Sequence, residues 1–399
     1  MSKKVKSVFL YLLMLVFVIC NNMIVSADSE ATKVYDYSEY TREYIPENLS
    51  SYFQEIHLEV ITGYLLSGKF ESDVSINSIE IGVPFTIYAA DSAKKENEVW
   101  YYPIYHDDEI KFMFLVYEHD GELNWKITTE FVDRLNEIEF TDDMLIVNEQ
   151  NKFFVVDGKN NKYFLQEYSD SSVENQISLQ LNNSSLNLLS ETSILSKQTR
   201  TAELYSLSGA VENMGNGYKC IMTDCFVRQF EDPICWAAAA ATIIRYLKPE
   251  YEDLTAKGVA YKVGDYSGID ISTEEGKKAC LVGRDADDTQ FALALYGIYY
   301  SLLDRKLTYS ELKDEINNGA PLLMLSVYHN EKTNEDFGHI TVIYGYYTYG
   351  SIRYIMMWNP GTGEEEAFEY KLDGTTEYYY SSCYFEWNST ICNGAYVVK

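Results

Sequence analysis

The sequence predicts an α+β protein in which two folded parts are joined by a polar linker. Along residues 28–168, apolar residues at helical spacing give way to strand-like runs that are separated by turn signals. Residues 169–204 are rich in Ser and Asn, a composition typical of an exposed connection. Residues 205–399 combine an alanine-rich helical segment with apolar strands. The chain of 399 residues is long enough for two domains.

The first part is expected to be rich in strands. Leu, Ile and aromatic residues recur at helical spacing over 48–67, and a short helix is expected over 129–138. His119, Asp120 and Gly121 form a turn signal that is typical of a β-hairpin. The predicted strands are 78–89, 99–105, 111–117, 123–128, 144–147, 153–156 and 162–167.

The charge and the motif content exclude several classes of function. The chain has 61 acidic and 32 basic residues, a formal net charge of −29, so a nucleic acid or an anionic membrane surface would repel it. His57, His106 and His119 lie apart from one another, without the spacing of metal ligands. The sequence contains no glycine-rich phosphate loop. We therefore expect no nucleic-acid partner, no metal and no cofactor.

Residues 1–27 have the pattern of an export signal. Lysines near the N-terminus precede an apolar run over residues 8–20, which is too short to span a bilayer comfortably. Small residues at positions 25–27 provide a cleavage site, so the mature chain would begin at Asp28. An uncleaved signal anchor is the alternative. No second long apolar segment follows, and we expect an exported protein without a stable membrane anchor.

All the cysteines that remain after such a cleavage lie in residues 205–399. Cys220 and Cys225 are close enough in the sequence to pair, as are Cys383 and Cys392. An extracellular chain built on disulfides is usually smaller and denser in Cys. We therefore expect few or no structural disulfides.

Cys235 stands where a helix is predicted to start. Asp232 is a suitable N-cap and Pro233 suits the first helical position, while Pro249 would stop the helix. Cys235 then falls in the first turn, where unpaired backbone N–H groups and the positive end of the helix dipole favour a thiolate. A nucleophilic cysteine needs this ionised form. The alternative is an inert cysteine in the core of a buried, alanine-rich helix.

Gln229 is a candidate partner of this cysteine. It lies six residues before Cys235, where a loop could fold the side-chain amide back beside the thiol. The amide N–H and the backbone N–H of Cys235 would then form an oxyanion hole. The alternative is a surface glutamine in a loop.

His339 and Asn359 are predicted to face each other across two apolar strands joined by a loop over 348–350. With Tyr349 at the loop centre, the two residues lie directly opposite on one sheet face, with Cβ atoms ~5 Å apart. The Asn oxygen could accept a hydrogen bond from one imidazole nitrogen and leave the other for the thiol. A one-residue bulge would shift this register without destroying the contact. The alternatives are a structural sheet histidine and a strand-end asparagine, and His329 could compete as the base.

Together these residues resemble the motifs of papain-like cysteine peptidases, and among them the secreted bacterial staphopain type. The motifs that carry the resemblance are Gln229, Cys235-Trp236, Gly338-His339 and Trp358-Asn359-Pro360. The resemblance covers about residues 205–399 and implies two subdomains beside a cleft, a helical one with the Cys and an antiparallel sheet with the His. Residues 28–168 are similar to the strand-rich propeptides of such enzymes. Ile234 departs from many relatives, which have Ser or Trp there, and this concerns the substrate pocket.

The resemblance implies a secreted bacterial cysteine endopeptidase that is made as a zymogen. Its substrate would be a polypeptide, and its own N-terminal prodomain would be an intramolecular inhibitor. Cys235 would attack the peptide carbonyl, and His339 would serve as acid and base. Asn359 would orient His339, and Gln229 would hold the oxyanion. The alternatives are a transamidase or other acyltransferase, and a non-catalytic exported binding protein.

Overall fold

The computed structural model describes residues 44–65, 78–90, 94–95, 99–141, 144–149, 152–167, 211–213, 219–221, 225–230, 232–330, 335–349, 352–372, 375–380 and 383–394. These described residues belong to one compact unit. We call residues 44–167 the N-terminal module and residues 211–394 the C-terminal module. The export signal predicted at 1–27 and the linker predicted at 169–204 lie outside the described residues.

Most of the helices and strands predicted for the N-terminal module are present in the structure. These elements are α2 (Glu47–Leu65), β1 (Glu80–Ile81), β2 (Ile87–Ala89), β3 (Lys94–Lys95), β4 (Val99–His106), β5 (Glu109–His119), β6 (Glu122–Thr128), α3 (Val132–Ile138), β7 (Leu145–Glu149), β8 (Lys152–Val156) and β9 (Lys162–Glu167). The expected hairpin turn joins β5 to β6. Asp120 and Gly121 have φ values of 51° and 79°, the left-handed geometry that such a turn requires.

Two predicted elements of this module differ from the structure. The strand predicted over 78–89 is interrupted between β1 and β2, where Pro84 has no N–H to donate to a ladder. The helix predicted over 129–138 begins only at Val132. Its N-cap, Phe131, has a left-handed φ of 67°, which a residue inside an α-helix cannot adopt.

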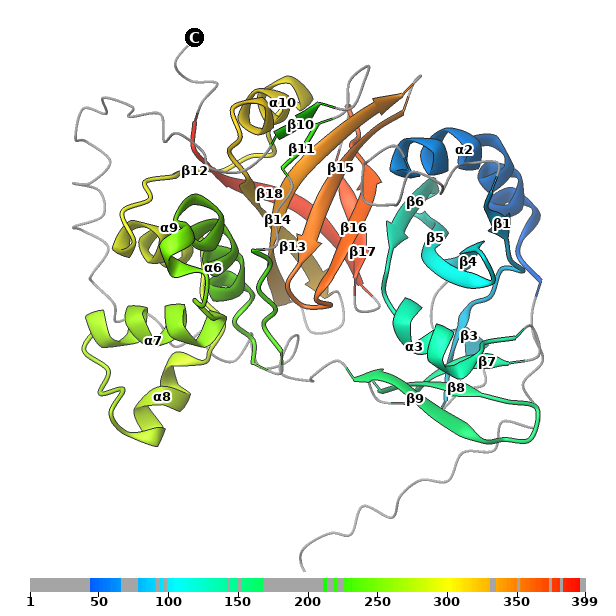
Figure 1. Cartoon of the computed structure of the whole chain (residues 1–399), viewed down its shortest axis with the longest axis horizontal. Helices are drawn as coiled ribbons and strands as arrows, with labels where there is room; N and C mark the ends of the chain where they lie inside the picture. The colour runs from blue at the N-terminus through cyan, green and yellow to red at the C-terminus, as the bar shows by residue number, and fades with distance from the viewer. Residues whose placement is uncertain are drawn as a thin grey trace, which may run out of the picture. The chain divides into compact units, whose positions relative to one another are not determined.

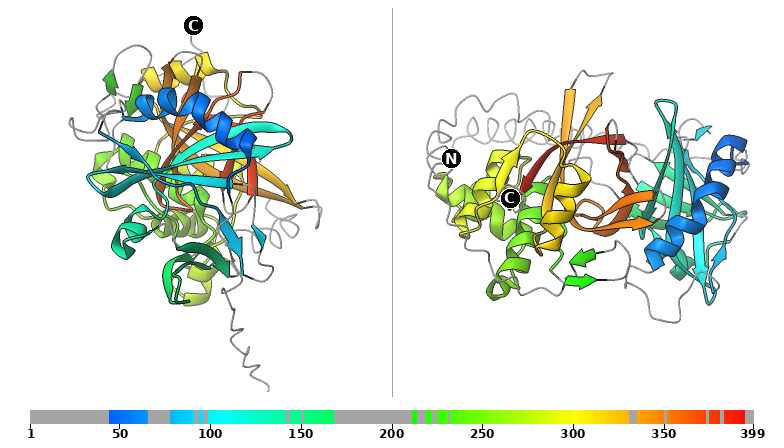
Figure 2. Two further views of the ribbon diagram at one scale, coloured as in Figure 1. Left: turned by 90° about the vertical axis from the view of Figure 1, so that its right-hand side faces the viewer. Right: turned by 90° about the horizontal axis from the view of Figure 1, so that it is seen from above.

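The C-terminal module combines helices with antiparallel strands. Its elements are β10 (Val211–Asn213), β11 (Lys219–Ile221), α6 (Cys235–Leu247), a 3₁₀ helix (Pro249–Tyr251), α7 (Ala256–Tyr266), α8 (Glu274–Cys280), α9 (Ala286–Leu295), β12 (Ser301–Leu303), α10 (Tyr309–Asn317), β13 (Leu322–Asn330), β14 (Glu335–Tyr349), β15 (Ile352–Asn359), β16 (Glu364–Glu369), β17 (Glu377–Tyr380) and β18 (Cys383–Cys392). Helices α6 to α9 gather on one side of the strands (Figures 1 and 2), and α6 packs against β14. The described chain is thus an α+β protein with a large antiparallel sheet, as predicted.

One antiparallel sheet runs through both modules. Its strand order is β1-β4-β5-β6-β16-β15-β14-β13-β18-β12, and β10, β11 and β17 are attached beside it. The junction is the pairing of β6 with β16, in which Ile127 lies opposite Ala367 and Lys126 lies opposite Phe368. The N-terminal module therefore adds its strands to an edge of the C-terminal sheet. A second sheet of the N-terminal module has the order β3-β2-β7-β8-β9.

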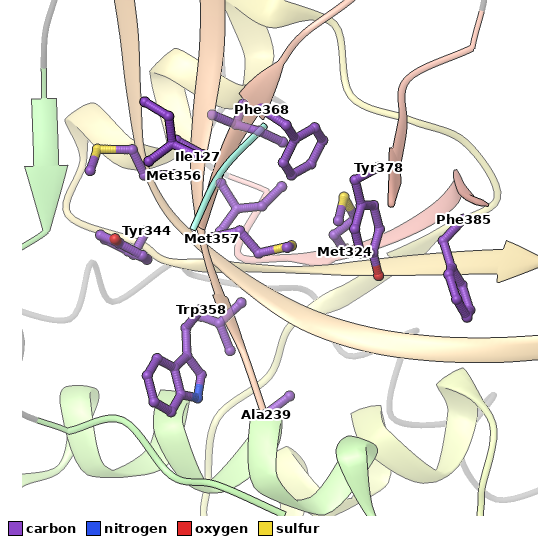
Figure 3. Close-up of a cluster of buried hydrophobic side chains, with 14 of the residues drawn as sticks. Ile127, Ala239, Met324, Tyr344, Met356, Met357, Trp358, Phe368, Tyr378 and Phe385 are labelled. Atoms are coloured by element: carbon purple, nitrogen blue, oxygen red, sulfur yellow. The ribbon is translucent and has the colours of Figure 1, made fainter. Parts of the chain in front are cut away.

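The buried core is continuous across the junction between the modules. Figure 3 shows Ile127 of β6 in one cluster with Met356 and Phe368 of the C-terminal sheet, and Trp358 beside Ala239 of α6. Helix α2 also packs against both β5 and β14. Burial of this apolar surface stabilises the contact between the modules. Among the described helices, none combines the length and the apolar character needed to cross a membrane.

Candidate active site

Helix α6 begins at Cys235 itself. Its N-cap is Ile234, which has no capping side chain, so the predicted cap at Asp232 and first position at Pro233 are wrong. The backbone oxygen of Asp232 accepts a hydrogen bond from the N–H of Ile234 (2.8 Å), and its carboxylate pairs with Lys257 (2.7 Å). These contacts hold Asp232 in the turn ahead of the helix. Cys235 is buried at the N-terminal end, where unpaired N–H groups and the helix dipole favour an anion.

The rest of α6 is a rigid support for this end. The helix ends at Leu247, and Pro249 follows it as predicted. The run of alanines after Trp236 is buried and lets neighbouring elements approach closely. The indole Nε1–H of Trp236 donates to the backbone oxygen of Val282 (2.9 Å), and the guanidinium of Arg284 lies 5.5 Å from the ring centroid. These contacts hold the first turn of α6 against the loop that precedes α9.

The segment that leads to Gln229 connects α6 to the end of β15. The N–H of Val227 donates to the hydroxyl of Thr242 on α6 (3.0 Å), and its carbonyl accepts from Trp358 Nε1–H of β15 (3.1 Å). The N–H of Gln229 donates to the carbonyl of Pro360, just beyond β15 (3.0 Å). Gln229 is therefore tied by its backbone to the residue next to Asn359.

The side chain of Gln229 is buried beside a strained turn. It is 3% exposed, and its Oε1 has no hydrogen-bond partner among the described residues. The next residue, Phe230, has a φ of 57° and a largely exposed side chain. This left-handed geometry is unfavourable for a bulky residue, and such strain is often found at functional sites. Since no described side chain or backbone group bonds the amide oxygen of Gln229, that atom could interact with a ligand.

His339 and Asn359 are in direct contact. Nε2 of His339 lies 2.8 Å from Oδ1 of Asn359, and both side chains are buried. Oδ1 also accepts from the N–H of Gly361 (3.0 Å), so this atom is an acceptor and Nε2 must carry the hydrogen. In the neutral imidazole, Nδ1 then has the lone pair. The hydrogen bond expected from the sequence is present, and it leaves Nδ1 as the basic nitrogen.

The strand register that produces this contact differs from the prediction. Tyr349 pairs with Ile352, so the predicted loop centre belongs to β14, and Gly350 lies outside the described residues. Counted from that pair, His339 and Asn359 would point to opposite faces of the sheet, because side chains alternate along a strand. A β-bulge in β14 after Ile343 adds one residue to this strand. Beyond the bulge the register is shifted by one residue, and Val342 pairs with Trp358.

Because of this bulge, the side chains of His339 and Asn359 point to the same face of the sheet. One residue beyond the pair of Val342 and Trp358, Asn359 falls opposite Thr341, on the same face as His339. The two side chains meet diagonally instead of directly across the strands. The predicted register was wrong by two residues near the site, and the contact survives because this error is an even number.

Burial changes the acidity of His339 strongly. Its side chain lies among β13, β15 and β18, with the ring of Phe385 6.0 Å away. Desolvation lowers the pKa of His339 to about 4; the hydrogen bond to Asn359 opposes this change, and the positive charge of Lys126 adds to it. At neutral pH the imidazole of the intact chain is therefore uncharged.

A buried ionic row continues behind Asn359. The Nδ2–H of Asn359 donates to Oε1 of Glu366 on β16 (3.2 Å), which also faces the hydroxyl of Thr362 (3.4 Å). Oε2 of Glu366 lies 2.9 Å from Nζ of Lys126 on β6, and these two side chains are 0% and 1% exposed. Nζ of Lys126 also donates to the backbone oxygen of Tyr379 (2.9 Å). Sequence reasoning missed Glu366 and Lys126, because neither belongs to a recognisable motif.

The other histidines lie outside this arrangement. His329, the competing base, is exposed and pairs with Asp336 (2.7 Å) where β13 ends and β14 begins. His57 stacks on Phe53 of its own helix, and His119 stacks on Tyr384. Within the described residues, no group of three or more His, Cys, Asp and Glu side chains could hold a metal ion.

The cysteines of the C-terminal module are all thiols in the structure. None of Cys220, Cys225, Cys235, Cys280, Cys383 and Cys392 is in a disulfide. Cys280, at the end of α8, donates to the backbone oxygen of Gly276 (3.2 Å), and burial raises the pKa of its thiol. Cys235 differs from Cys280 in that it stands at the positive end of a helix.

The structure links three of the four predicted residues, and it places Cys235 on a helix that packs against the strand of His339. His339 and Asn359 touch, Gln229 is bound to the residue after Asn359, and Cys235 begins the helix that packs against β14. A cysteine at a helix N-terminus, a neutral imidazole with its lone pair on Nδ1, and a buried amide are the groups that acyl transfer requires. Their catalytic roles remain predictions.

Comparisons with known proteins add little to this geometry. No family model matches the sequence, and no curated protein matches it. Among solved structures, the chain is similar to one described as "Structural basis for the limited antibody cross reactivity between the mite allergens Blo t 1 and Der p 1", with 14% identity and a TM-score of 0.26. The match covers 42% of this chain and 66% of that one, so the chain spans just under two thirds of its length. This similarity carries no argument about fold or function.

Proposed function

We propose that this chain is the latent form of an exported, papain-like cysteine endopeptidase. The observation that carries the proposal is the buried hydrogen bond between His339 Nε2 and Asn359 Oδ1, 2.8 Å long. It fixes the imidazole so that Nε2 carries the hydrogen and Nδ1 the lone pair, which is the arrangement that a base-assisted thiol needs. The packing of α6 against β14 supports a pairing of Cys235 with that nitrogen.

In the proposed reaction, the Cys235 thiolate attacks the carbonyl carbon of a peptide bond. The side-chain N–H of Gln229 and the backbone N–H of Cys235 stabilise the oxyanion that forms. The imidazolium of His339 protonates the leaving amine, and a thioester with the acyl half remains. His339 then takes a proton from water, which attacks the thioester and releases the acid product and the thiolate.

The contacts of the N-terminal module support a latent state of this site. Strand β6 occupies the edge of β16, and the buried imidazole of His339 has a pKa of about 4, so the imidazolium that the reaction needs is disfavoured. In the proposal, cleavage within residues 169–204 frees the module. The positive charge of Lys126, which lowers the pKa of His339, leaves with the module, and the ion pair with the thiolate is then favoured.

Export follows from the signal predicted at residues 1–27 and is part of the same proposal. An extracellular peptidase with a C-terminal catalytic module benefits from a covalently attached inhibitor, because the enzyme then stays inactive during synthesis. The proposed substrates are unfolded or extended polypeptides, which can place a peptide carbonyl beside a cysteine in a cleft.

The test compares the full chain with two cysteine variants. Wild type, Cys235→Ala and Cys280→Ala are incubated at neutral pH, and their size is followed by electrophoresis and mass spectrometry. Wild type and Cys280→Ala should lose the N-terminal module by a cut within 169–204, while Cys235→Ala should remain intact. Cys280 is the control because it is a buried thiol of the same module without a helix N-terminus.

A second readout covers activation by another protease. Limited trypsin cleavage in the linker, near Lys197 and Arg200, is followed by an assay on an unfolded protein and by mapping of the thiol that iodoacetamide alkylates. We expect Cys235 to be alkylated and its alanine variant to be inactive. Full proteolysis by Cys235→Ala would reject the proposed function.

A further inference from the structure

Four adjacent strands carry one continuous row of polar contacts across the junction between the modules. The row runs from His339 on β14 through Asn359 on β15 and Glu366 on β16 to Lys126 on β6. All four side chains are less than 5% exposed. A buried carboxylate and a buried ammonium each require a partner of opposite charge or a hydrogen bond. The ion pair and its neighbouring hydrogen bonds therefore fix the positions of these side chains.

We propose that Glu366 is a positioning residue of the His339–Asn359 pair, and that Lys126 of the N-terminal module controls the pair through it. The inference rests on the proposed function for its meaning in catalysis, and on the row of contacts for its geometry. Oε1 of Glu366 accepts from the Nδ2–H of Asn359, so it acts together with the N–H of Gly361 to fix which end of that amide faces His339. Oε2 faces Lys126 at 2.9 Å.

The opposite charges at the end of the row act on His339 in opposite senses. The ammonium of Lys126 lowers the pKa of His339 and so disfavours the imidazolium. A carboxylate at Glu366 has the opposite charge and would favour it. In the intact chain the two charges offset each other behind Asn359. When the N-terminal module leaves, Lys126 leaves with it, and Glu366 stays with the C-terminal module. Removal of the inhibitor thus also removes the charge that opposes the active form of the histidine.

Other titratable groups lie around the Lys126–Glu366 pair and interact with its charges. Glu130 of the N-terminal module and Glu364 of β16 are carboxylates whose pKa is raised, mainly by burial, and each feels Glu366. Tyr64 of α2 is a buried phenol that also feels Glu366. Lys126 is the cation that acts on Glu130, Glu366 and His339 alike. Its removal therefore has a predictable sign at the histidine.

The test measures the pKa and the tautomer of the His339 imidazole, and it does not depend on peptidase activity. The full chain carries Cys235→Ala, its histidines are labelled with ¹⁵N, and the His339 signals are assigned by their loss in His339→Gln. The titration gives the pKa and the ¹⁵N shifts give the tautomer. With Lys126→Met we expect the pKa of His339 to rise by about one pH unit, because a cation is removed. With Lys126→Arg, which keeps the charge, the pKa of His339 should stay at about 4.

A pair of neutral double variants isolates the orienting role. Lys126→Met with Glu366→Gln keeps an oxygen for the Nδ2–H of Asn359, and Lys126→Met with Glu366→Leu keeps none. Neither leaves a buried charge unpaired, so both should fold. We expect hydrogen on Nε2 of His339 in the Gln variant and a mixture of tautomers in the Leu variant. Glu386→Gln, an exposed carboxylate on β18, is the control for charge alone.

The outcomes separate this inference from the proposed function. An unchanged pKa in Lys126→Met, or the same tautomer in both double variants, would overturn the inference even in an active peptidase. The expected shifts in a chain whose Cys235 proves unreactive would support the positioning row and reject the peptidase. A merely structural role of Glu366 would alter the stability of both double variants without changing the tautomer.

Discussion

The ion pair of Lys126 and Glu366 makes a sharp prediction about stability. Lys126→Met keeps most of the side-chain volume but leaves Glu366 without its counter-ion, and both positions are about 1% exposed or less. Removing one partner of such a buried pair costs about 3–5 kcal/mol of the free energy of unfolding. Burial already raises the pKa of Glu366, so the orphaned carboxyl would take up a proton at acid pH. The loss should therefore be smaller at pH 5 than at pH 8.

Urea unfolding of the full chain with Cys235→Ala measures this loss. With a slope of about 3 kcal/mol per molar urea, the midpoint at pH 8 should fall by about 1 M or more. The matched control is Lys111→Met, because Lys111 lies 2.8 Å from Glu109 but the two side chains are 27% and 66% exposed. That variant should leave the midpoint unchanged within error. Equal effects of the two substitutions would refute the reasoning from burial.

Two further predictions concern Glu130 and Gly276. Burial raises the pKa of Glu130 from 4.5 to about 8, so the folded chain binds the extra proton between these values and loses stability as the pH rises through them. Glu130→Gln should therefore raise the urea midpoint relative to wild type at pH 8 and not at pH 4.5; a difference independent of pH would contradict this. Gly276→Ala should lower the thermal midpoint despite the better helix propensity of Ala, because the added Cβ would collide with the backbone oxygen of Asp270. Gly258→Ala on α7 is its control, since its nearest neighbours lie at 3.4 Å, and it should be neutral or stabilising.

The elements of the N-terminal module could be predicted because their signals are local. The helical spacing over 48–67 and the turn at Asp120 and Gly121 act over a few residues, and both were found. The two errors in the elements of this module come from details of the backbone. The interruption at Pro84 comes from a missing donor, and the late start of α3 comes from the left-handed geometry of Phe131. Such backbone details depend on packing that a pattern does not contain.

The candidate site could be predicted in its residues but not in its geometry. The sequence pointed to His339 and Asn359 because both lie on apolar strands joined by a short loop. The actual contact depends on a bulge between Ile343 and Gly345. A glycine inside a strand often marks a bulge, but it does not determine the register that results. The cap of α6 was likewise misplaced, because Asp232 pairs with Lys257 of α7 instead of with the helix.

The sequence by itself determined the α+β character of the described chain and the residues that form its polar contact at the centre of the sheet. It could not show that Lys126 is buried. In β6 this lysine alternates with Trp125 and Ile127, a pattern that places it on a water-facing side. Only the tertiary structure decided that Glu366 of another module lies against it. A charge can be buried only where an opposite charge meets it, and that meeting depends on how distant strands pair.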